Sequence, residues 1–316
     1  MIINKTILIL GGTGALGNTL TERYHHNNTI IILSRDEHKQ VNMKRKYPNV
    51  LFQIGDIKDK SSILQAINEY KPQVIINAAA LKHVPICEEN PYESVKTNII
   101  GHKHLIDCIN ISNHRIETLM FISTDKACSP VNVYGMCKAI SERLYVDFAN
   151  KQSNIKVCLC RYGNVLESTG SVIPFFKHLL QNGKKSLPIT HKDMTRFLLT
   201  LEEAVDLIEW AYSHPDSHGK IVIPNIKALK VVDIAKVLGK AYGHPNLSLD
   251  YIGIRPGEKL HEAMISETES FRTINYKNYF MISDEVVNTN SWVFESSSNL
   301  MDSSQAENFL SKSRVI

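Results

Sequence analysis

A glycine-rich loop near the start of the chain limits the fold more than any other feature. The run GGTGALG at 11–17 follows a short apolar segment at 6–10 and precedes a helical pattern that extends through Tyr24. Three glycines at this spacing, placed between a strand and a helix, let the backbone approach a pyrophosphate at the helix N-terminus. The loop therefore predicts a dinucleotide site whose first contacts are Gly11, Thr13, Gly14, Ala15, Leu16 and Gly17.

Apolar runs alternate with helical patterns over the first half of the chain. These strand-like runs lie at 6–10, 29–33, 50–54, 74–77, 119–123 and 157–161. Strands that alternate with helices predict an α/β fold, here a Rossmann-like doubly wound parallel sheet with right-handed crossovers. The rhythm changes after Tyr162. We therefore expect a dinucleotide-binding domain at 1–165 with a return around 200–224, and a smaller C-terminal α/β substrate-binding domain at 166–316.

The second half of the chain carries a less regular pattern. We expect helices at 171–180, interrupted by Pro174, and at 92–111, 134–150, 201–212, 231–242 and 260–265. Strands are expected at 220–223 and 249–254. The tail from Asn288 is rich in Ser and Asn, so it reads as a surface wrap or a partly disordered segment.

Composition excludes several classes of partner. The chain has 316 residues, 43% of them hydrophobic, and a net charge of only +4, which gives no electrostatic case for nucleic acid or an acidic membrane. Its six cysteines form no CxxC pair and no zinc-type spacing, so we expect no metal and a reducing compartment. No apolar run is long enough to span a bilayer, which favours a soluble, cytoplasmic protein.

The end of the second strand indicates which dinucleotide binds. Ser34 and Arg35 suit a 2′-phosphate, which favours NADP over NAD, although Asp36 follows directly. Asp56 either meets the adenine amino group or caps a helix. The small side chains at 78–80 leave room for the nicotinamide ribose. Further candidate cofactor contacts are Ile57, Ala78, Ala79, Ala80, Lys82, Asn98 and Ser123.

A strand–turn–helix segment at 119–138 gathers the reactive groups. Its helix carries Tyr134 and Lys138 four residues apart and therefore on one face. The Lys138 ammonium would stabilise the tyrosinate and lower the pKa of Tyr134. A solvated Tyr/Lys pair is the alternative. The segment lies where ligands bind an open α/β sheet, at the carboxyl end of a strand.

Three polar residues, Thr124, Asp125 and Lys126, follow that strand directly. The Thr124 hydroxyl can reach a substrate oxygen. Asp125 and Lys126 place an acid beside a base, and the alternative for this pair is a loop ion pair.

The motifs resemble those of the inverting UDP-N-acetylglucosamine 4,6-dehydratases, of the extended short-chain dehydrogenase/reductase superfamily and polysaccharide biosynthesis type. The resemblance covers nearly the whole chain, with AAALKHVP and STDKA the most diagnostic. The matching motifs include AAALKHVPICEENP (78–91), STDKA (123–127), YGMCK (134–138), RYGNV (161–165), MTRF (194–197) and GIRPGEKLHE (253–262). Some members carry methionine in place of Tyr134, and the tail departs most from the family.

The resemblance implies a reaction and a role for each residue. Tyr134 would take the proton of the carbon-4 hydroxyl while hydride passes to NADP, and Lys126 would take the carbon-5 proton. Lys126 would need partial desolvation to be neutral at pH 7. Asp125, kept protonated in an apolar site, would protonate the leaving carbon-6 hydroxyl. The implied product is UDP-2-acetamido-2,6-dideoxy-β-L-arabino-hex-4-ulose, the first intermediate of a modified amino-sugar route.

The resemblance also implies substrate contacts and assembly. A surface ion pair is the alternative for Arg196 and Arg255, and His83 is expected to be structural. The residues expected to hold the UDP-sugar are Lys82, Thr124, Asn164, Ser171, Val172, Arg196, Arg255 and Glu258. Helices at 92–111 and 134–150 are expected to pair in a homo-oligomer, a dimer or a hexamer. A retaining dehydratase, a UDP-sugar 4-epimerase and a nonenzymatic NADP-binding regulator are the competing readings.

Overall fold

A nine-stranded sheet forms the centre of the protein. The computed structural model describes residues 1–168 and 170–316. The strand order is β14-β15-β10-β6-β5-β4-β1-β2-β3, and all neighbours from β3 to β10 are parallel. This confirms the predicted doubly wound sheet. Its strands are β1 (Thr6–Leu10), β2 (Thr29–Ser34), β3 (Leu51–Ile54), β4 (Val74–Asn77), β5 (Thr118–Ile122), β6 (Lys156–Cys160), β10 (Ile221–Pro224), β14 (Thr273–Asn275) and β15 (Tyr279–Ile282).

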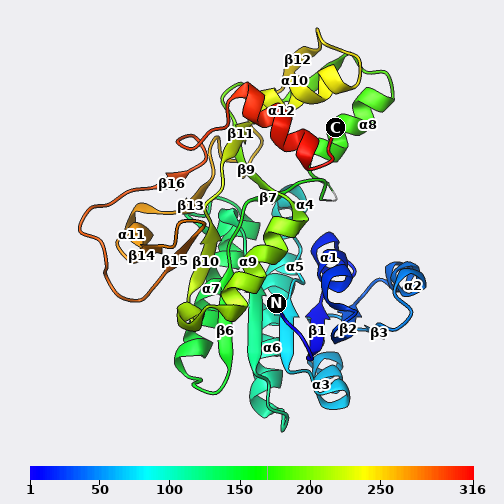
Figure 1. Ribbon diagram of the computed structural model, residues 1–316, viewed down its shortest axis with the longest axis vertical. Coiled ribbons are helices and arrows are strands. Elements are labelled where there is room, and N and C mark those ends of the chain that lie inside the picture. Colours follow the sequence, from blue (N-terminus) through cyan, green and yellow to red (C-terminus); the bar gives the residue numbers. More distant parts are fainter. Residues whose placement is uncertain (169) are drawn as a thin grey trace.

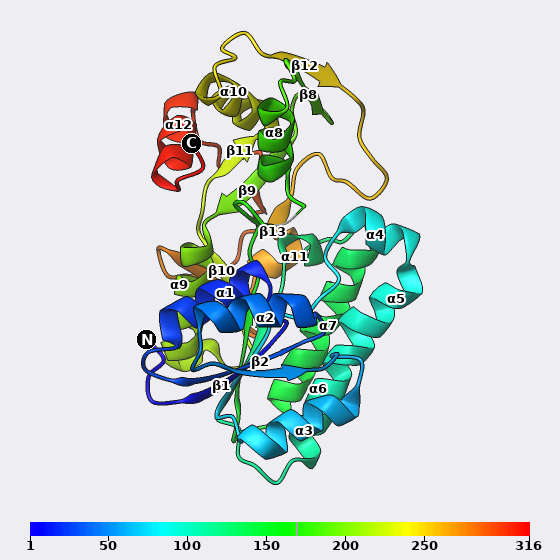
Figure 2. The same cartoon turned by 90° about the vertical axis from the view of Figure 1, so that its right-hand side faces the viewer.

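Helices cover both faces of this sheet (Figure 2). In β1, Ile7 and Ile9 pack with α1, α2 and α9, whereas Leu8 and Leu10 pack with α3, α6 and α7. A strand buried on both faces reads as an unbroken apolar run, which explains TILIL. The helices are α1 (Ala15–Tyr24), α2 (Glu37–Lys46), α3 (Lys60–Tyr70), α4 (Val84–Glu89), α5 (Pro91–Val95), a π-helical turn (Lys96–Ile100), α6 (Gly101–Ile111), α7 (Val133–Asn150) and α9 (Leu201–Ser213).

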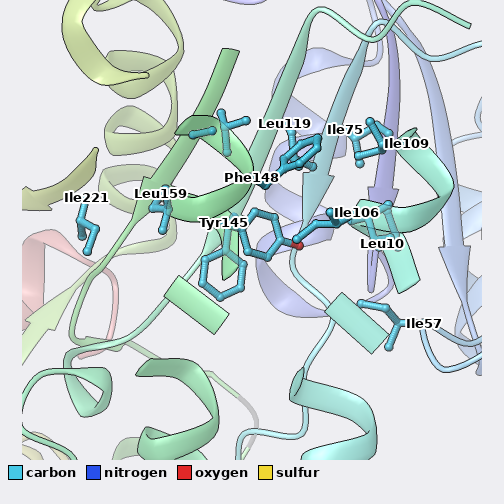
Figure 3. Packing of buried hydrophobic residues seen from close by; sticks show 14 of the residues in the cluster. Leu10, Ile57, Ile75, Ile106, Ile109, Leu119, Tyr145, Phe148, Leu159 and Ile221 are labelled. Carbon is cyan, nitrogen blue, oxygen red and sulfur yellow. The ribbon is translucent and has the colours of Figure 1, made fainter. Parts of the chain in front are cut away.

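The core under the site is closely packed. Figure 3 shows side chains of α6 and α7 against those of β1, β4, β5 and β6. Phe121 and Tyr145 stack with ring centroids 4.4 Å apart, and the Tyr145 hydroxyl accepts a 2.7 Å hydrogen bond from Asn77. Because a buried hydroxyl without a partner would be costly, this bond fixes the Tyr145 ring beneath the strand ends.

A second body, which we call the upper body, lies above the carboxyl ends of these strands (Figure 1). Its core is formed by α8, α10 and α12 with short strands. Its elements are β7 (Asn164–Val165), α8 (Val172–Gln181), β8 (Ser186–Ile189), β9 (Thr195–Leu199), β11 (Ala228–Lys230), α10 (Val231–Ala241), β12 (Ser248–Tyr251) and α12 (Ser303–Lys312). Two further strands, β13 (Ala263–Ile265) and β16 (Phe294–Glu295), pair near α11 (Glu267–Ser270).

Three sequence predictions are wrong in this half. The segment expected as a helix at 260–265 contains strand β13, because Met264 and Ile265 enter the core beside β16. Pro174 does not interrupt α8, since it lies in the first turn, where a helix needs no amide donor. The tail ends in a regular helix, α12, which a capping box of Asp302 and Gln305 begins.

Candidate active site

The glycine loop forms a narrow cradle between β1 and β4. Gly11 has a φ of +72°, and a Cβ added there would lie 2.8 Å from the Cα of Ala79. A Cβ on Gly17 would lie 2.1 Å from the carbonyl oxygen of Gly12. Gly14 is the N-cap of α1 and supplies no capping side chain, so the first amides of α1 have no side-chain acceptor there. This cradle fits the pyrophosphate of a dinucleotide.

The loop at 78–81 is shaped from below by polar side chains. Asn98 accepts a 2.9 Å hydrogen bond from the Leu81 amide and donates one of 2.8 Å to the Leu81 carbonyl. Nε2 of His102 lies 3.2 Å from the Ala79 carbonyl, and burial together with Lys138 holds the pKa of His102 well below its usual value. A neutral imidazole must donate to a carbonyl. Asn98 and His102 therefore fix the backbone on which Ala78, Ala79 and Ala80 stand.

Arg35, at the end of β2, is not paired with the carboxylate of Asp36, its neighbour in the same turn. The Asp36 side chain accepts from the Lys39 amide at 3.0 Å and thereby caps α2. Ser34 is buried, and its hydroxyl accepts from Gln40. Arg35 lies 3.6 Å from the Asp56 carboxylate and is half exposed. With Asp36 committed to the helix, Arg35 remains available to an anion.

Asp56 does not cap a helix. Its carboxylate accepts a 2.9 Å bond from the Lys58 amide, and the N-cap of α3 is Asp59. The interpretation of Asp56 as a helix cap is therefore wrong, because the cap lies further along the chain at Asp59. Ile57, the next residue, is buried and packs against Gly101 of α6.

The residues after β5 form a tight 3₁₀ turn, Asp125–Ala127, that begins at Thr124. The Thr124 hydroxyl donates to Oδ1 of Asp125 at 2.9 Å, and Nζ of Lys126 lies 3.0 Å from the same oxygen. Asp125 is fully buried, and its Oδ2 has no hydrogen-bond partner among the residues that the structure describes. An orphaned carboxylate oxygen in a dry site leaves one acceptor for an incoming group.

Lys126 is surrounded by acceptors from three parts of the chain. Besides Asp125, its Nζ donates to Oδ1 of Asn164 at 2.9 Å and lies 3.9 Å from Oε1 of Glu262. Burial acts to lower the pKa of Lys126, but Asp125 and Glu262 outweigh it and raise the pKa. The predicted base role required partial desolvation to make Lys126 neutral at pH 7; the burial is present, but the neighbouring carboxylates raise the pKa instead. Glu262 ends the GIRPGEKLHE motif, yet sequence reasoning gave it no role.

Tyr134 lies beside the 124–126 turn, at the start of α7. It is 8% exposed, and burial raises the pKa of its hydroxyl, with the neighbouring Thr124 hydroxyl acting in the opposite direction. Lys138 lies on the same helix, where Nζ donates to the Ile122 carbonyl at 2.7 Å and sits 4.5 Å from the Phe121 ring centroid. Burial lowers the pKa of Lys138 to about 7, against the effect of Glu142. The predicted lowering of the pKa of Tyr134 by Lys138 is thus not seen, because burial dominates both groups.

A buried charge network, which sequence reasoning missed, supports the same turn. Arg161 is 1% exposed and pairs with Glu142 at 2.6 Å and with Glu269 at 2.8 Å. Glu142 accepts from the Ser123 hydroxyl at 2.6 Å, and Cys128 Sγ lies 3.5 Å from Glu269. The signal available was a lone arginine that closes the apolar strand KVCLC.

Four of the residues expected to bind the UDP-sugar come from three segments: Lys82, Ser171 with Val172, and Arg196. Lys82 is close enough to Lys126 that its pKa is lowered, first by desolvation and then by that charge. Ser171 is the N-cap residue of α8, and its buried hydroxyl has no hydrogen-bond partner among residues 1–168 and 170–316; Val172 follows. Arg196 is buried, with Nη1 on the Thr195 carbonyl at 2.7 Å and Nη2 on the Lys259 carbonyl at 3.0 Å.

Arg255 and Glu258 lie on the loop between β12 and β13. The Arg255 side chain is 51% exposed, and its Nη1 lies 3.9 Å from Oε1 of Glu258. This is the surface ion pair considered as the alternative for Arg255. For Arg196 that alternative is wrong, because its guanidinium is buried against backbone carbonyls.

Across residues 1–168 and 170–316, no group of three His, Cys, Asp or Glu side chains could hold a metal ion. Over the same residues, no helix is long and apolar enough to cross a membrane.

Comparison with known proteins identifies the family. The chain matches the family described as "Polysaccharide biosynthesis protein" over residues 7–284. It is 44% identical over 295 residues to a UDP-N-acetylglucosamine 4,6-dehydratase (inverting) of Campylobacter jejuni, covering 90% of this chain and 85% of that protein. It is 36% identical over 292 residues to a UDP-glucose 4-epimerase of Rickettsia typhi, covering 89% and 84%.

Solved structures share the fold. The structure of Pen from Bacillus thuringiensis superposes with a TM-score of 0.90 at 27% identity, covering 99% of both chains. DesIV, a dTDP-glucose 4,6-dehydratase from Streptomyces venezuelae, superposes with a TM-score of 0.71 at 19% identity, covering 81% of this chain and 86% of that one. The family match and the sequence identity confirm the resemblance drawn from the motifs, and the chain belongs to the polysaccharide biosynthesis protein family.

Proposed function

We propose that this protein is an NADP-dependent UDP-N-acetylglucosamine 4,6-dehydratase that inverts carbon 5. The proposal rests on the arrangement of Asp125 and Lys126. The Lys126 amine contacts the buried Oδ1 of Asp125, so an acid and a base lie together beside Tyr134. A 4-epimerase needs no acid–base pair for carbons 5 and 6. The relative at 44% identity, named as an inverting dehydratase, supports the same assignment.

The side chains divide the proton transfers among them. Tyr134 takes the proton of the carbon-4 hydroxyl of the sugar. The phenolic oxygen that accepts it lies beside Thr124. Lys126 takes the proton of carbon 5, and Asp125 delivers one to the leaving hydroxyl of carbon 6. The orphaned Oδ2 of Asp125 provides the acceptor or donor position that this step needs. A bound nicotinamide would supply a hydride acceptor for carbon 4 and a hydride donor for carbon 6, and reprotonation of carbon 5 from the opposite face would invert that centre.

The cofactor site supports NADP over NAD. The cradle at Gly11 and Gly17 accommodates a pyrophosphate, because a Cβ at either position would enter the space of the loop. Asp36 caps α2 and so is not offered to a ribose hydroxyl. Arg35 is half exposed and can pair with a 2′-phosphate. Lys138, whose pKa burial lowers to about 7, is proposed to hold the nicotinamide ribose.

The UDP end is proposed to lie along the upper body. Ser171, whose hydroxyl has no partner in the described part of the chain, lies at the start of α8. Arg255 and Glu258 lie on an exposed loop that can close on a diphosphate and a ribose. Arg196 acts here by holding the carbonyls of Lys259 and Leu260, which position that loop. Lys82 faces the sugar beside Lys126.

We also infer a cytoplasmic homo-oligomer. The helices expected to pair, at 92–111 and 134–150, expose large apolar side chains, which solvent-facing helices rarely carry together. They are Tyr92, Ile100, Ile111, Met136 and Ile140. Light scattering that gives a monomer at working concentration would contradict this inference.

One experiment tests the function. The protein is incubated with UDP-N-acetylglucosamine and NADP in heavy water, and the sugar is followed by proton NMR. A carbon-6 methyl signal with deuterium at carbon 5 and L-arabino couplings is the expected result. A D-xylo pattern would mean a retaining dehydratase, and a galacto product without a methyl group would mean a 4-epimerase. The epimerase is the second candidate, because relatives with that name are 36% identical. Cofactor binding with no turnover would favour a regulator.

A further inference from the structure

Glu262 is a buried acid that the proposed reaction leaves without a role. It is 3% exposed, and Ser296 holds its backbone on both sides. The Glu262 amide donates to the Ser296 hydroxyl at 2.9 Å, and the Ser296 amide donates to the Glu262 carbonyl at 2.8 Å. Its side chain therefore starts from a fixed backbone and extends toward the 124–126 turn, where its Oε1 lies 3.9 Å from Nζ of Lys126.

The carboxylate of Glu262 is incompletely satisfied. Its Oε2 is buried and has no hydrogen-bond partner among the described residues, and Nζ of Lys259 lies 3.7 Å away. A buried carboxylate oxygen normally has a partner, so an orphan indicates a group that is used at another stage.

The charged groups around Glu262 differ in how firmly they are held. Lys259 donates to the Cys128 carbonyl at 2.7 Å, and Arg196 donates to three backbone carbonyls. Lys126 has three ammonium donors, of which Asp125 and Asn164 take two. Lys126 therefore has one donor left for Glu262, and of the two lysines near this carboxylate it is the one that the proposed reaction uses as a base.

We propose that Glu262 exchanges a proton with Lys126 during turnover, so that Lys126 can alternate between ammonium and neutral amine. The inference rests on the proposed function, in which Lys126 is the carbon-5 base. In the step, an Nζ–H bond of Lys126 breaks and an O–H bond forms on Glu262. The charged pair becomes a neutral pair, and no further reactant is needed.

The electrostatics of the site explain why such a partner is needed. Asp125 and Glu262 raise the pKa of Lys126 against the effect of burial. Neutral Lys126 is therefore costly near pH 7 unless a nearby group takes its proton. Burial raises the pKa of Glu262 as well, although Lys126, Arg196 and Lys259 oppose this and Asp125 adds to it. The distance of 3.9 Å exceeds a hydrogen bond, so the flexible Lys126 side chain must approach by about 1 Å.

The test compares Glu262→Gln, Glu262→Asp and a control, Glu267→Gln, which changes an exposed acid a few residues away. Each variant is mixed with UDP-N-acetylglucosamine and NADP in heavy water. Reduced-nicotinamide absorbance reports oxidation of carbon 4, and NMR reports carbon-5 deuterium and the carbon-6 methyl group. We expect E262Q to retain the oxidation but to lose deuterium exchange and methyl formation by about 100-fold. The control is expected to match the wild type.

Glu262→Asp keeps the charge and serves if E262Q does not fold, which thermal unfolding will show. Its carboxyl lies one methylene further back, so we expect methyl formation to fall by about 10-fold across the pH range. A wild-type rate in E262D would overturn the proposal.

A purely electrostatic neighbour gives a different result from a proton partner. Loss of the Glu262 charge would then lower the pKa of Lys126, so E262Q would shift the acidic limb of the pH–rate profile downward and keep its plateau. That outcome overturns the proposal. Absence of methyl product from the wild type itself overturns the proposed function, and this inference with it, before any variant is compared.

Discussion

Arg161 and Glu269 form a bidentate ion pair, with Nη1 3.0 Å from Oε2 and Nη2 2.8 Å from Oε1, although 108 residues separate them. Glu142 accepts from Nε and Nη2 of the same guanidinium, on the adjacent edge. Through Ser123 and Cys128, the network holds the chain on both sides of the 124–126 turn. Its role is to position that turn, since the charged side chains of Arg161, Glu142 and Glu269 form no hydrogen bond with Asp125 or Lys126 among the described residues.

Removing the charge of Glu269 should destabilise the protein. Glu269→Gln leaves Arg161 buried with a single carboxylate, and breaking a buried pair in this way costs about 3 kcal/mol of unfolding free energy. Denaturant unfolding at neutral pH measures it. Glu267→Gln, on the exposed side of the same short helix, should change stability by less than about 0.5 kcal/mol. Equal effects of the two variants would contradict the assignment.

The contribution of Glu269 to the free energy of unfolding should depend on pH within a defined range. Burial acts to raise its pKa, but Arg161 lowers it from 4.5 to about 2. A carboxyl with a depressed folded-state pKa stabilises the protein above its unfolded pKa and loses that contribution as pH falls. The stability difference between wild type and E269Q should thus be constant above pH 4.5 and shrink toward pH 2. A constant difference over that window would contradict it.

Lys138 should give a dependence of the same sign in a higher pH window. Burial lowers its pKa from 10.5 to about 7, so between these values the unfolded chain binds a proton that the folded chain does not. Stability therefore rises with pH in that window, by at most about 1.4 kcal/mol per unit. Lys138→Met removes the effect. The unfolding free energy of wild type minus that of K138M should increase from pH 7 to pH 10, and a flat difference would show that Lys138 titrates normally.

Arg35 should decide the cofactor preference. Arg35→Glu replaces the cation at the end of β2 by a carboxylate, which repels a 2′-phosphate and accepts from a ribose hydroxyl. We expect NADP affinity to fall by about 10- to 100-fold, the range of a charge-assisted hydrogen bond, with NAD affinity unchanged or improved. Calorimetry with both cofactors measures this. Arg45→Glu, an exposed arginine on α2, is the matched control.

Variants of Asp125 and Lys126 should block different steps. Lys126→Ala removes the base, so carbon-5 deuterium exchange should fall by about 10²- to 10⁴-fold. Asp125→Asn removes the acid. The 4-keto sugar should then still exchange its carbon-5 hydrogen for deuterium, but little of its carbon-6 hydroxyl should leave. NMR in heavy water distinguishes these outcomes. Lys192→Ala, on an exposed turn, is the control. Loss of exchange in D125N with retention in K126A would reverse the assigned roles.

Local pattern predicted the large sheet well. A buried parallel strand is an apolar run such as TILIL, and its glycine loop follows directly, so sequence alone located β1, α1 and the cradle. The same reasoning found the 124–126 turn and α7. The short strands after β7 were harder, because a run such as LHEAMI suits a helix and a three-residue strand equally, and only its partner β16 decides.

Charge effects at the site could not be predicted from sequence. The pKa of Lys126 depends on Glu262, and that of Glu269 depends on Arg161, and each pair is separated by more than a hundred residues. Spacing rules report neighbours on one helix or strand, not residues that meet across two bodies. Glu262 and Arg161 were visible inside quoted motifs, but no pattern assigns either a partner.

The position of Glu269 in the sequence has a consequence for synthesis. When the ribosome has delivered β6, Arg161 has Glu142 as its partner, and Glu269 is still 108 residues away. Until β13 and α11 emerge, half of the guanidinium must remain hydrated, and water must reach the strand ends beneath it. The 124–126 turn therefore becomes dry only when the chain is nearly complete.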